Sequence, residues 1–440
     1  MLFEVSNIVT LVFKIVLCIS ILFASNRIVY AIMGFGERIN FPNSKKNCKF
    51  AILIPARNES KVIDDLFHAL AGQKYPKEKF DVFVIVKQKT DKTVEIAQNY
   101  GFNVYVDEQQ KCKGDALDYA IKDIYAKNLQ YDAFLIFDAD NIPTKDFLAE
   151  MNKAVCSGYD IGIGYRNSKN WNDGWVACST GLTFSIINTL SNKGRTKAGT
   201  NCIFSGTGYF IKKSVLDKFA GWPFKTLTED YEISQYATLN NLKTAYVENA
   251  EFFDEQPTTL AVSIKQRERW VKGFLSANKI YTKKIAKAIF TDKQNKFAKI
   301  EQTLGIIPIA MIVADVILYA LFQIGFFVTA KIVSVDSTLF ARQFFATLEG
   351  TYLVLVALTM IMFLAEKKRV QINSKTILST LLLNPFYMSL YIPIAIKAIF
   401  SKNIGWDKIE HTRTKSQIEA EKIKEEEDEN DKARETNKNI

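Results

Sequence analysis

Histidine is almost absent from this sequence, which has only two, His68 and His411, among 440 residues. Metal sites built mainly from imidazole, and catalytic triads of serine, histidine and aspartate, are therefore nearly excluded. Any acid–base chemistry must then come from carboxylates, of which the chain has 47.

Cysteine is present but lacks the spacing that binds metal. The six cysteines are scattered, and no two of them stand in a Cys-x-x-Cys pair. This argues against a zinc site and is typical of reduced, structural thiols in a cytosolic domain. The six are Cys18, Cys48, Cys112, Cys156, Cys178 and Cys202.

Acidic residues are fewer than basic ones. Lysine and arginine number 57, and the formal net charge is +10. This excess predicts an acidic partner, which is nucleic acid, the phosphates of a nucleotide or an anionic membrane face. Long apolar segments argue against the first of these, so we expect no nucleic-acid partner.

A first apolar run covers residues 8–24, with Lys14 inside it, and is long enough for a transmembrane helix. A cleaved signal peptide is the alternative, but the run has neither a basic start nor an obvious cleavage site. We expect residues 1–49 to form a transmembrane helix and a linker. The basic residues after the run place the N-terminus outside and the following chain in the cytosol. They are Arg27, Arg38, Lys45 and Lys46.

The C-terminal third predicts a membrane region over residues 303–400, because it contains three more long apolar runs. A basic triplet that begins at Lys367 separates the last two runs and should be cytosolic. We therefore expect a multi-pass protein of the plasma membrane. The three runs are residues 305–330, 345–364 and 377–400.

The tail, residues 401–440, is rich in lysine and glutamate, which predicts disorder. If all three runs cross the membrane, this tail ends outside, although such a tail is more natural in the cytosol. One run is then a hairpin or lies in the interface, and Pro385 and Pro393 make the last run the candidate.

Lysines with interleaved isoleucine, alanine and phenylalanine fill residues 279–302. The pattern is typical of a basic amphipathic helix on an anionic membrane surface, and a solvated helix face is the alternative.

Between these segments, residues 50–278 alternate short apolar strands with helical stretches. Alternation of this kind is typical of a doubly wound α/β sheet. The expected strands are residues 50–55, 81–86, 102–106 and 134–138.

Asp138 and Asp140 end the fourth strand, with Pro143 as a turn signal just beyond. Ligands of parallel sheets bind at the carboxyl ends of the strands. Mg²⁺ and Mn²⁺ take oxygen ligands, often one or two carboxylates together with substrate phosphates. The pair therefore predicts a site for a metal ion and a diphosphate, and a solvated turn is the alternative.

Further motifs follow in a fixed order: a Thr-Glu-Asp turn at residues 228–230 and Gln-Arg-Glu-Arg-Trp at residues 266–270, ahead of the apolar runs. With Asp138 and Asp140, they make residues 50–274 resemble the processive membrane-bound branch of glycosyltransferase family 2. That branch includes cellulose, hyaluronan, chitin and poly-N-acetylglucosamine synthases. The resemblance implies a GT-A-type nucleotide-sugar-binding domain, with a mixed, mostly parallel sheet, inserted between transmembrane helices.

The resemblance also implies roles. Asp140 would bind Mg²⁺ or Mn²⁺, Asp138 would contact the nucleotide or a metal-bound water, and Asp230 would be the general base. Arginine forks suit phosphates, and an indole face suits a sugar ring. The expected donor-binding residues are Pro55, Ala56, Glu59, Lys113, Asp138, Arg267 and Arg269. The expected acceptor-binding residues are Trp270, Gln266, Glu229, Ser205 and Gly206.

One position departs from the family. An acidic residue usually ends the second strand near the uracil, and this sequence has Lys87 there. Either Lys87 meets a phosphate, or the nucleotide is not uridine diphosphate.

The sequence thus predicts an inverting, metal-dependent hexosyl- or N-acetylhexosaminyltransferase with a cytosolic catalytic domain. The donor would be a nucleotide-sugar, most naturally UDP-linked, and the product a β-linked polysaccharide. Single sugar transfer to a lipid, giving a glycolipid, is the first alternative. A membrane-anchored scaffold that binds a nucleotide or a glycan without turnover is the second. An accessory export or regulatory subunit would suit the polymer hypothesis.

Overall fold

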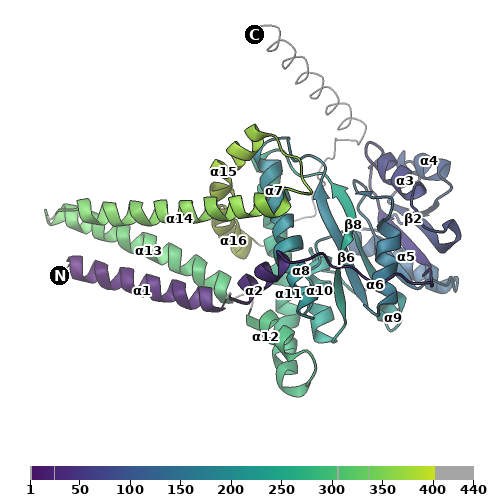
Figure 1. Ribbon diagram of the computed structural model, residues 1–440, viewed down its shortest axis with the longest axis horizontal. Coiled ribbons are helices and arrows are strands. Elements are labelled where there is room, and N and C mark those ends of the chain that lie inside the picture. Colours follow the sequence, from purple (N-terminus) through teal and green to yellow (C-terminus); the bar gives the residue numbers. More distant parts are fainter. Residues whose placement is uncertain (1, 24, 305–306, 335, 402–440) are drawn as a thin grey trace, which may run out of the picture.

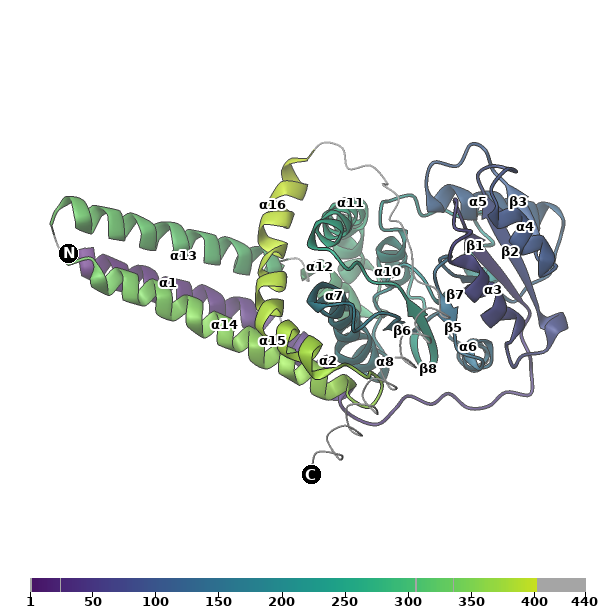
Figure 2. The same cartoon turned by 90° about the horizontal axis from the view of Figure 1, so that it is seen from above.

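The computed structural model describes residues 2–23, 25–304, 307–334 and 336–401. An α/β domain forms one end of the molecule, and long helices project from it as a bundle (Figures 1 and 2). Shorter helices lie between these two parts (Figure 2).

The domain is built on one eight-stranded sheet with the order β3-β2-β1-β4-β7-β6-β8-β5. Four of its neighbouring pairs are parallel and three are antiparallel, so the predicted mixed, mostly parallel sheet is confirmed. The strands are β1 Phe50–Pro55, β2 Phe80–Val86, β3 Asn103–Val106, β4 Ala133–Ile136, β5 Ile142–Pro143, β6 Ile161–Ser168, β7 Tyr209–Lys212 and β8 Thr244–Asp254.

Helices bury both faces of this sheet, which is why its central strands are apolar throughout. In β4, Leu135 packs into the core on one face, and Phe134 and Ile136 pack into the core on the other. The first face carries α3 Ile63–Ala71, α4 Thr93–Asn99 and α6 Phe147–Cys156. The second carries α5 Lys113–Ala126, α10 Glu229–Leu239 and the end of α11 Leu260–Thr291.

Three long helices form the projecting bundle: α1 Leu2–Phe23, α13 Ile307–Ile332 and α14 Thr338–Glu366. The rings of Phe13 and Tyr319 stack at 4.3 Å between centroids and join α1 to α13. Among the described residues, four segments are long and apolar enough to cross a membrane, and these three helices contain the first three. The segments are Glu4–Leu22, Ala314–Ile332, Phe340–Glu366 and Ser374–Phe400.

The last apolar run differs from the others in geometry. It divides into α15 Ser374–Ser389 and α16 Tyr391–Phe400, which lie across the base of the bundle rather than along it (Figures 1 and 2). At 16 and 10 residues, each helix is shorter than the roughly 20 residues that a spanning helix needs. The expectation that the last run is a hairpin or lies in the interface stays a prediction, since Ser374–Phe400 as a whole is long enough to span. The tail from residue 402 lies outside the described residues.

The expected domain boundary at residue 278 falls inside α11, which continues without a break to Thr291. Tyr281 and Ile285 are buried in the core of the second sheet face, so this part of the lysine-rich segment packs on the domain. A second helix, α12 Lys296–Leu304, completes the segment.

The remaining elements are shorter helices, and α7 continues directly into a π-helical turn, η2. They are α2 Ser25–Gly34, η1 Lys77–Lys79, α7 Trp175–Ser185, η2 Ile186–Asn192, α8 Lys193–Lys197 and α9 Lys213–Leu216.

Glu366, the last residue of α14, fastens the bundle to the domain. Its carboxylate accepts hydrogen bonds from the Tyr165 hydroxyl at 2.7 Å and the Thr189 hydroxyl at 2.5 Å. Tyr165 lies on β6 and Thr189 on η2, so one side chain connects three elements. Glu366 is only 3% exposed, and water therefore cannot replace it as the acceptor.

We predict that Glu366→Ala lowers the midpoint of thermal unfolding of the detergent-solubilised protein by several degrees. Each buried hydroxyl left without an acceptor costs roughly 1–3 kcal/mol. Glu366→Gln keeps one acceptor oxygen and should lose less, and replacing the exposed Lys368 by alanine should change little. Equal midpoints for Glu366→Ala and Lys368→Ala would show that this contact does not hold the parts together.

Candidate active site

A cavity of about 390 Å³ opens where the carboxyl ends of the central strands meet α7, α11 and α16. Its lining divides into a charged part, on the sheet, and an aromatic part. The charged side chains of the lining are Glu59, Asp138, Asp140, Glu229, Asp230, Asp254, Glu255, Arg57, Lys113, Arg166 and Arg269. The aromatic ones are Phe184, Phe204, Tyr231, Trp270, Phe274 and Tyr391.

Asp138 and Asp140 lie on a turn directly after β4, which ends at Ile136, two residues earlier than expected. The buried side chains of Asn141 and Thr207 fix this turn, because the amide of Asp138 donates to both, at 3.1 and 2.8 Å. Thr207 also donates a short hydrogen bond to Asn141. The two aspartates are therefore held in place before any ligand binds.

Lys113 is the first residue of α5 and reaches across the cavity floor. Its ammonium lies 2.6 Å from Asp138 Oδ1, 2.6 Å from the carbonyl oxygen of Gly206 and 3.6 Å from Glu229 Oε1. Burial opposes the charge, but the surrounding acids outweigh it and raise the pKa of Lys113. The next residue must be glycine, because a Cβ at Gly114 would lie 2.9 Å from the Phe224 carbonyl oxygen.

Glu229 and Asp230 are the first two residues of α10, and both line the cavity. The positive end of the helix favours acids there. Burial raises the pKa of both carboxyls, to about 7 for Glu229, and the neighbouring Asp230 charge adds to this effect. Gly206 lies beside Asp230 at φ +85°, a backbone conformation that favours glycine.

The helix α11 presents two faces with different partners. Gln266, Arg269, Trp270 and Phe274 recur at helical spacing and line the cavity. The Trp270 ring packs edge-on against Phe184 of α7 at 5.7 Å between centroids.

Arg267 lies on the other face, and the structure does not bring it to the cavity. It is fully buried, donates to the Tyr387 carbonyl oxygen at 2.7 Å, and stacks on the rings of Tyr387 and Tyr391. Residues two apart on a helix point about 200° apart, so Arg267 and Arg269 cannot share one phosphate group from the same face.

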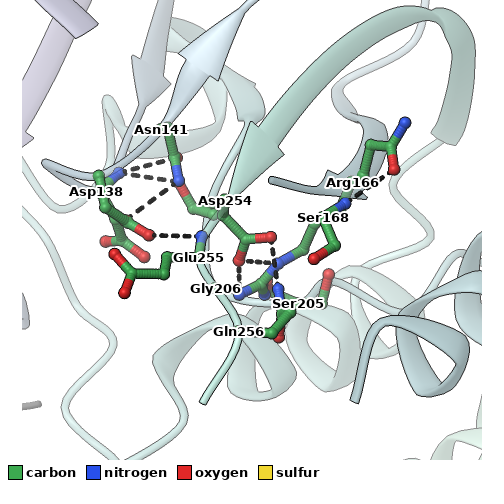
Figure 3. A network of polar contacts seen from close by, with 12 residues as sticks. Asp138, Asn141, Arg166, Ser168, Ser205, Gly206, Asp254, Glu255 and Gln256 are labelled. Carbon is green, nitrogen blue, oxygen red and sulfur yellow. Dashed lines mark hydrogen bonds and ion pairs between the residues drawn. The ribbon is translucent and has the colours of Figure 1, made fainter. Parts of the chain in front are cut away.

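Arg166 and Asp254 form a buried ion pair that the sequence analysis did not identify (Figure 3). Arg166 Nε donates to Asp254 Oδ2 at 2.6 Å, and Nη1 donates to the Ser205 carbonyl oxygen at 2.7 Å. Burial raises the pKa of Asp254 to about 6, although Arg166 acts in the opposite direction. One signal was available, because a single arginine inside an apolar strand implies a buried partner.

Thirteen of the fourteen residues expected to form the site line this one cavity, and Arg267 is the exception. Lys87 is not in the lining. Its ammonium donates to the carbonyl oxygen of Gln110 at 3.2 Å, and Gln110 does line the cavity. The thirteen are Pro55, Ala56, Glu59, Lys113, Asp138, Asp140, Ser205, Gly206, Glu229, Asp230, Gln266, Arg269 and Trp270.

The donor set around Asp140 suits a cation that takes few protein ligands. Its Oδ1 accepts from the Asn141 amide at 3.3 Å, and Oδ2 accepts from the Glu255 amide at 3.1 Å. Each oxygen has a second lone pair, so these contacts leave room for a metal. Within the described ranges no cluster of three or more His, Cys, Asp or Glu side chains could hold an ion. Mg²⁺ and Mn²⁺ fit a carboxylate pair completed by substrate phosphates.

Several curated proteins are similar to this chain over about half its length. A probable glycosyltransferase, YdaM, of Bacillus subtilis is 27% identical, over 52% of this chain and 56% of its own. A beta-monoglucosyldiacylglycerol synthase of Nostoc is 24% identical, over 51% and 48%. Glucomannan 4-beta-mannosyltransferase 1 of rice is 23% identical, over 62% and 53%. The chain thus spans about half the length of the curated relatives it matches.

Among solved structures, a mannosyltransferase from Pyrobaculum calidifontis in complex with GDP-mannose and Mn²⁺ superposes with a TM-score of 0.57. It covers 92% of this chain and all of its own, at 14% identity, and so shows the shared fold. The family described as glycosyltransferase like family 2 matches residues 47–273, just over half of the 440 residues. Together with the cavity geometry, this shows that the chain belongs to glycosyltransferase family 2.

Proposed function

We propose that the protein transfers a sugar, with inversion, from a nucleotide-diphosphate donor to a hydroxyl presented at a membrane surface. One observation carries the proposal. Asp138 and Asp140, which can hold a metal, line the same cavity as Asp230, which can act as base. Lys113 links Asp138 to Glu229, the residue before Asp230. Membrane placement, with the catalytic domain on the cytosolic side, rests on the apolar bundle and on the basic residues that follow α1.

On the donor side, Asp138 and Asp140 would hold Mg²⁺ or Mn²⁺ together with the diphosphate. When bound, such an ion neutralises charge that develops on the leaving nucleotide. Arg269 and Lys113 supply fixed positive charge beside it. Pro55 and the rest of the β1 loop line the part of the cavity where the nucleoside would lie. The Mn²⁺ in the mannosyltransferase complex supports this assignment.

On the acceptor side, Asp230 takes the proton from the attacking hydroxyl. Burial keeps the pKa of this carboxyl above the usual value for aspartate, which improves its match to a hydroxyl near neutral pH. No nucleophilic carboxylate is needed, because direct attack by the acceptor inverts the anomeric centre. Trp270 and Phe184 offer flat faces on which an acceptor can rest.

We favour a lipid or lipid-linked saccharide as the acceptor. Tyr391 of α16, which crosses the base of the bundle, lines the cavity, so the aromatic part borders the membrane-side layer. Among the described residues, three long helices project from the domain, which are few to form the wall of an export channel. The lipid synthase among the relatives supports the same choice.

A growing β-linked polysaccharide is the second candidate. Stacking on Trp270 holds a sugar ring with little directional constraint, which suits a chain that must advance after each addition. The glucomannan mannosyltransferase among the relatives supports this candidate. An export or regulatory subunit would then supply what the three helices lack.

We predict that Asp140→Asn lowers the transfer rate at least about a hundredfold, because stabilisation of the leaving diphosphate is worth several kcal/mol. The protein should keep its thermal midpoint. Asp146→Asn, at an exposed position of the following loop, is the matched control and should retain activity. Release of nucleotide diphosphate from a panel of nucleotide-sugars with Mn²⁺ or Mg²⁺ measures the rate. Near-normal turnover of Asp140→Asn in limiting Mn²⁺ would exclude Asp140 as the ligand.

We predict that Asp230→Asn loses on the order of 10²–10⁴-fold in rate, with donor binding retained. In the wild type, the acid limb of kcat/KM should lie well above the value near 4 of an ordinary carboxyl, since the pKa of Asp230 is raised and that of Glu229 is about 7.

Activity is therefore lost as the pH falls through the raised pKa of the base, which then becomes protonated. Glu229→Gln removes the adjacent negative charge and should move the acid limb to lower pH. An acid limb that Glu229→Gln leaves in place would show that the pair does not control the base.

Trp270 separates the two acceptors. If the product is a polymer, Trp270→Ala should shorten it, and Trp270→Phe should partly restore its length. If the acceptor is a lipid, Trp270→Ala should lower the rate while the product remains one sugar larger than the acceptor. Product size is read by mass spectrometry of lipid extracts and by gel filtration of released glycan. A polymer from the wild-type protein would reject the lipid assignment.

A further inference from the structure

A second cavity, of about 630 Å³, lies between α7, the end of α14 and the loop that leads to α15. It shares no lining residue with the active-site cavity. We call it the α7–α14 groove. Its apolar wall comes from Met360, Phe363 and Leu364 of α14 and from Trp171 and Leu182 beside α7.

The groove lies where a membrane-spanning helix ends. The apolar segment of α14 runs to Glu366, and basic residues begin at Lys367. Met360, Phe363 and Leu364 share one face of the last turns of the helix. Leu364 is 59% exposed, so this face continues onto the lipid-facing surface of the bundle. A molecule of the bilayer can therefore reach the groove laterally, at the level of the headgroups.

The mouth of the groove is positively charged. Lys367 lines the groove, and Lys368 and Lys375 each lie within two residues of a lining residue; all three are exposed and form no ion pair within the described ranges. The neighbouring acid, Glu366, already accepts two internal hydrogen bonds, and Arg369 is paired with a buried glutamate at 2.9 Å. The lysine charge is thus left for a ligand from outside the chain.

We propose that the α7–α14 groove binds an anionic phospholipid of the surrounding bilayer. Its phosphate would face the lysines, and part of an acyl chain would cover Phe363 and Leu364. A soluble phosphate would leave the apolar wall exposed, and a zwitterionic lipid would gain less from the lysines. Apolar burial and charge therefore select the same ligand.

The groove and the active-site cavity are adjacent through α7. Leu182 lines the groove, and the next two residues, Thr183 and Phe184, line the cavity. A lipid in the groove would fix the side of α7 opposite the aromatic wall. We expect it to raise the thermal midpoint of the whole protein as well as to bind.

The test uses the full-length protein in neutral detergent, titrated with phosphatidylglycerol or phosphatidylcholine, with bound lipid counted by native mass spectrometry. Phosphatidylglycerol should bind at least tenfold more tightly. The double variant Lys367→Gln/Lys375→Gln should weaken it about twenty-five-fold, since each lysine near an anionic headgroup contributes a factor of about five. Lys89→Gln/Lys92→Gln makes the same charge change at exposed positions of the α/β domain outside the groove and should keep wild-type affinity.

A second pair of variants tests the shape of the groove at constant charge. Leu364→Trp fills the groove from an exposed position and should lower lipid occupancy, whereas Leu358→Trp, exposed on the same helix outside the groove, should not. Equal losses in both lysine pairs, or wild-type binding by Leu364→Trp, would overturn the proposal. Because no sugar donor is present, its failure would not bear on the proposed transfer reaction.

Discussion

The buried charge around Lys113 is the constraint on which the site depends. Seven carboxylates and four cationic side chains line one cavity, so the protein alone leaves an excess of negative charge there. Buried charges of one sign are tolerated only when partners or protons offset them. Lys113 meets two of the acids and Arg166 meets a third. Burial still raises the pKa of Glu229 to about 7 and that of Asp254 to about 6, against the effect of these cationic partners. A divalent cation would offset more of the same excess, which gives the proposed metal an electrostatic reason beyond its two ligands.

The sheet order explains how these charges come to one place. β4 lies between β1 and β7, so its end is flanked by the β1 loop on one side and by the segment before β7 on the other. That second segment supplies Ser205 and Gly206, whose carbonyl oxygens accept from Arg166 and Lys113. The turn after β4 is therefore flanked by residues of the proposed donor side, from the β1 loop, and by residues of the proposed acceptor side, from the segment before β7. The chain needs both parallel and antiparallel pairs to build this arrangement.

Sequence reasoning succeeded where a local pattern determines the position of a side chain. Asp138 and Asp140 follow an apolar run, and a buried parallel strand must deliver them to its carboxyl end. It failed where position depends on which face of an element is turned inward. Arg267 and Arg269 belong to one motif, but the helix sends the first towards α15 and α16 and the second to the cavity. Arg166 was missed because its partner, Asp254, stands 88 residues later and meets it only through the pairing of β6 with β8.

The misassigned arginine has a role of its own in the architecture. Arg267, Glu268 and Lys272 hold α16 through a stacked guanidinium, an ion pair with Lys397 and hydrogen bonds to the last carbonyl groups of that helix. Arg267, Glu268 and Lys272 belong to α11, and the opposite face of α11 carries Trp270 and Arg269 into the cavity. A rigid helix cannot move one face without the other, so any shift of α16 must also shift Trp270 and Arg269. If α16 lies in the membrane interface, as we propose, the aromatic end of the cavity moves with it, and this is the physical reason to look for an acceptor that arrives from the bilayer rather than from solution.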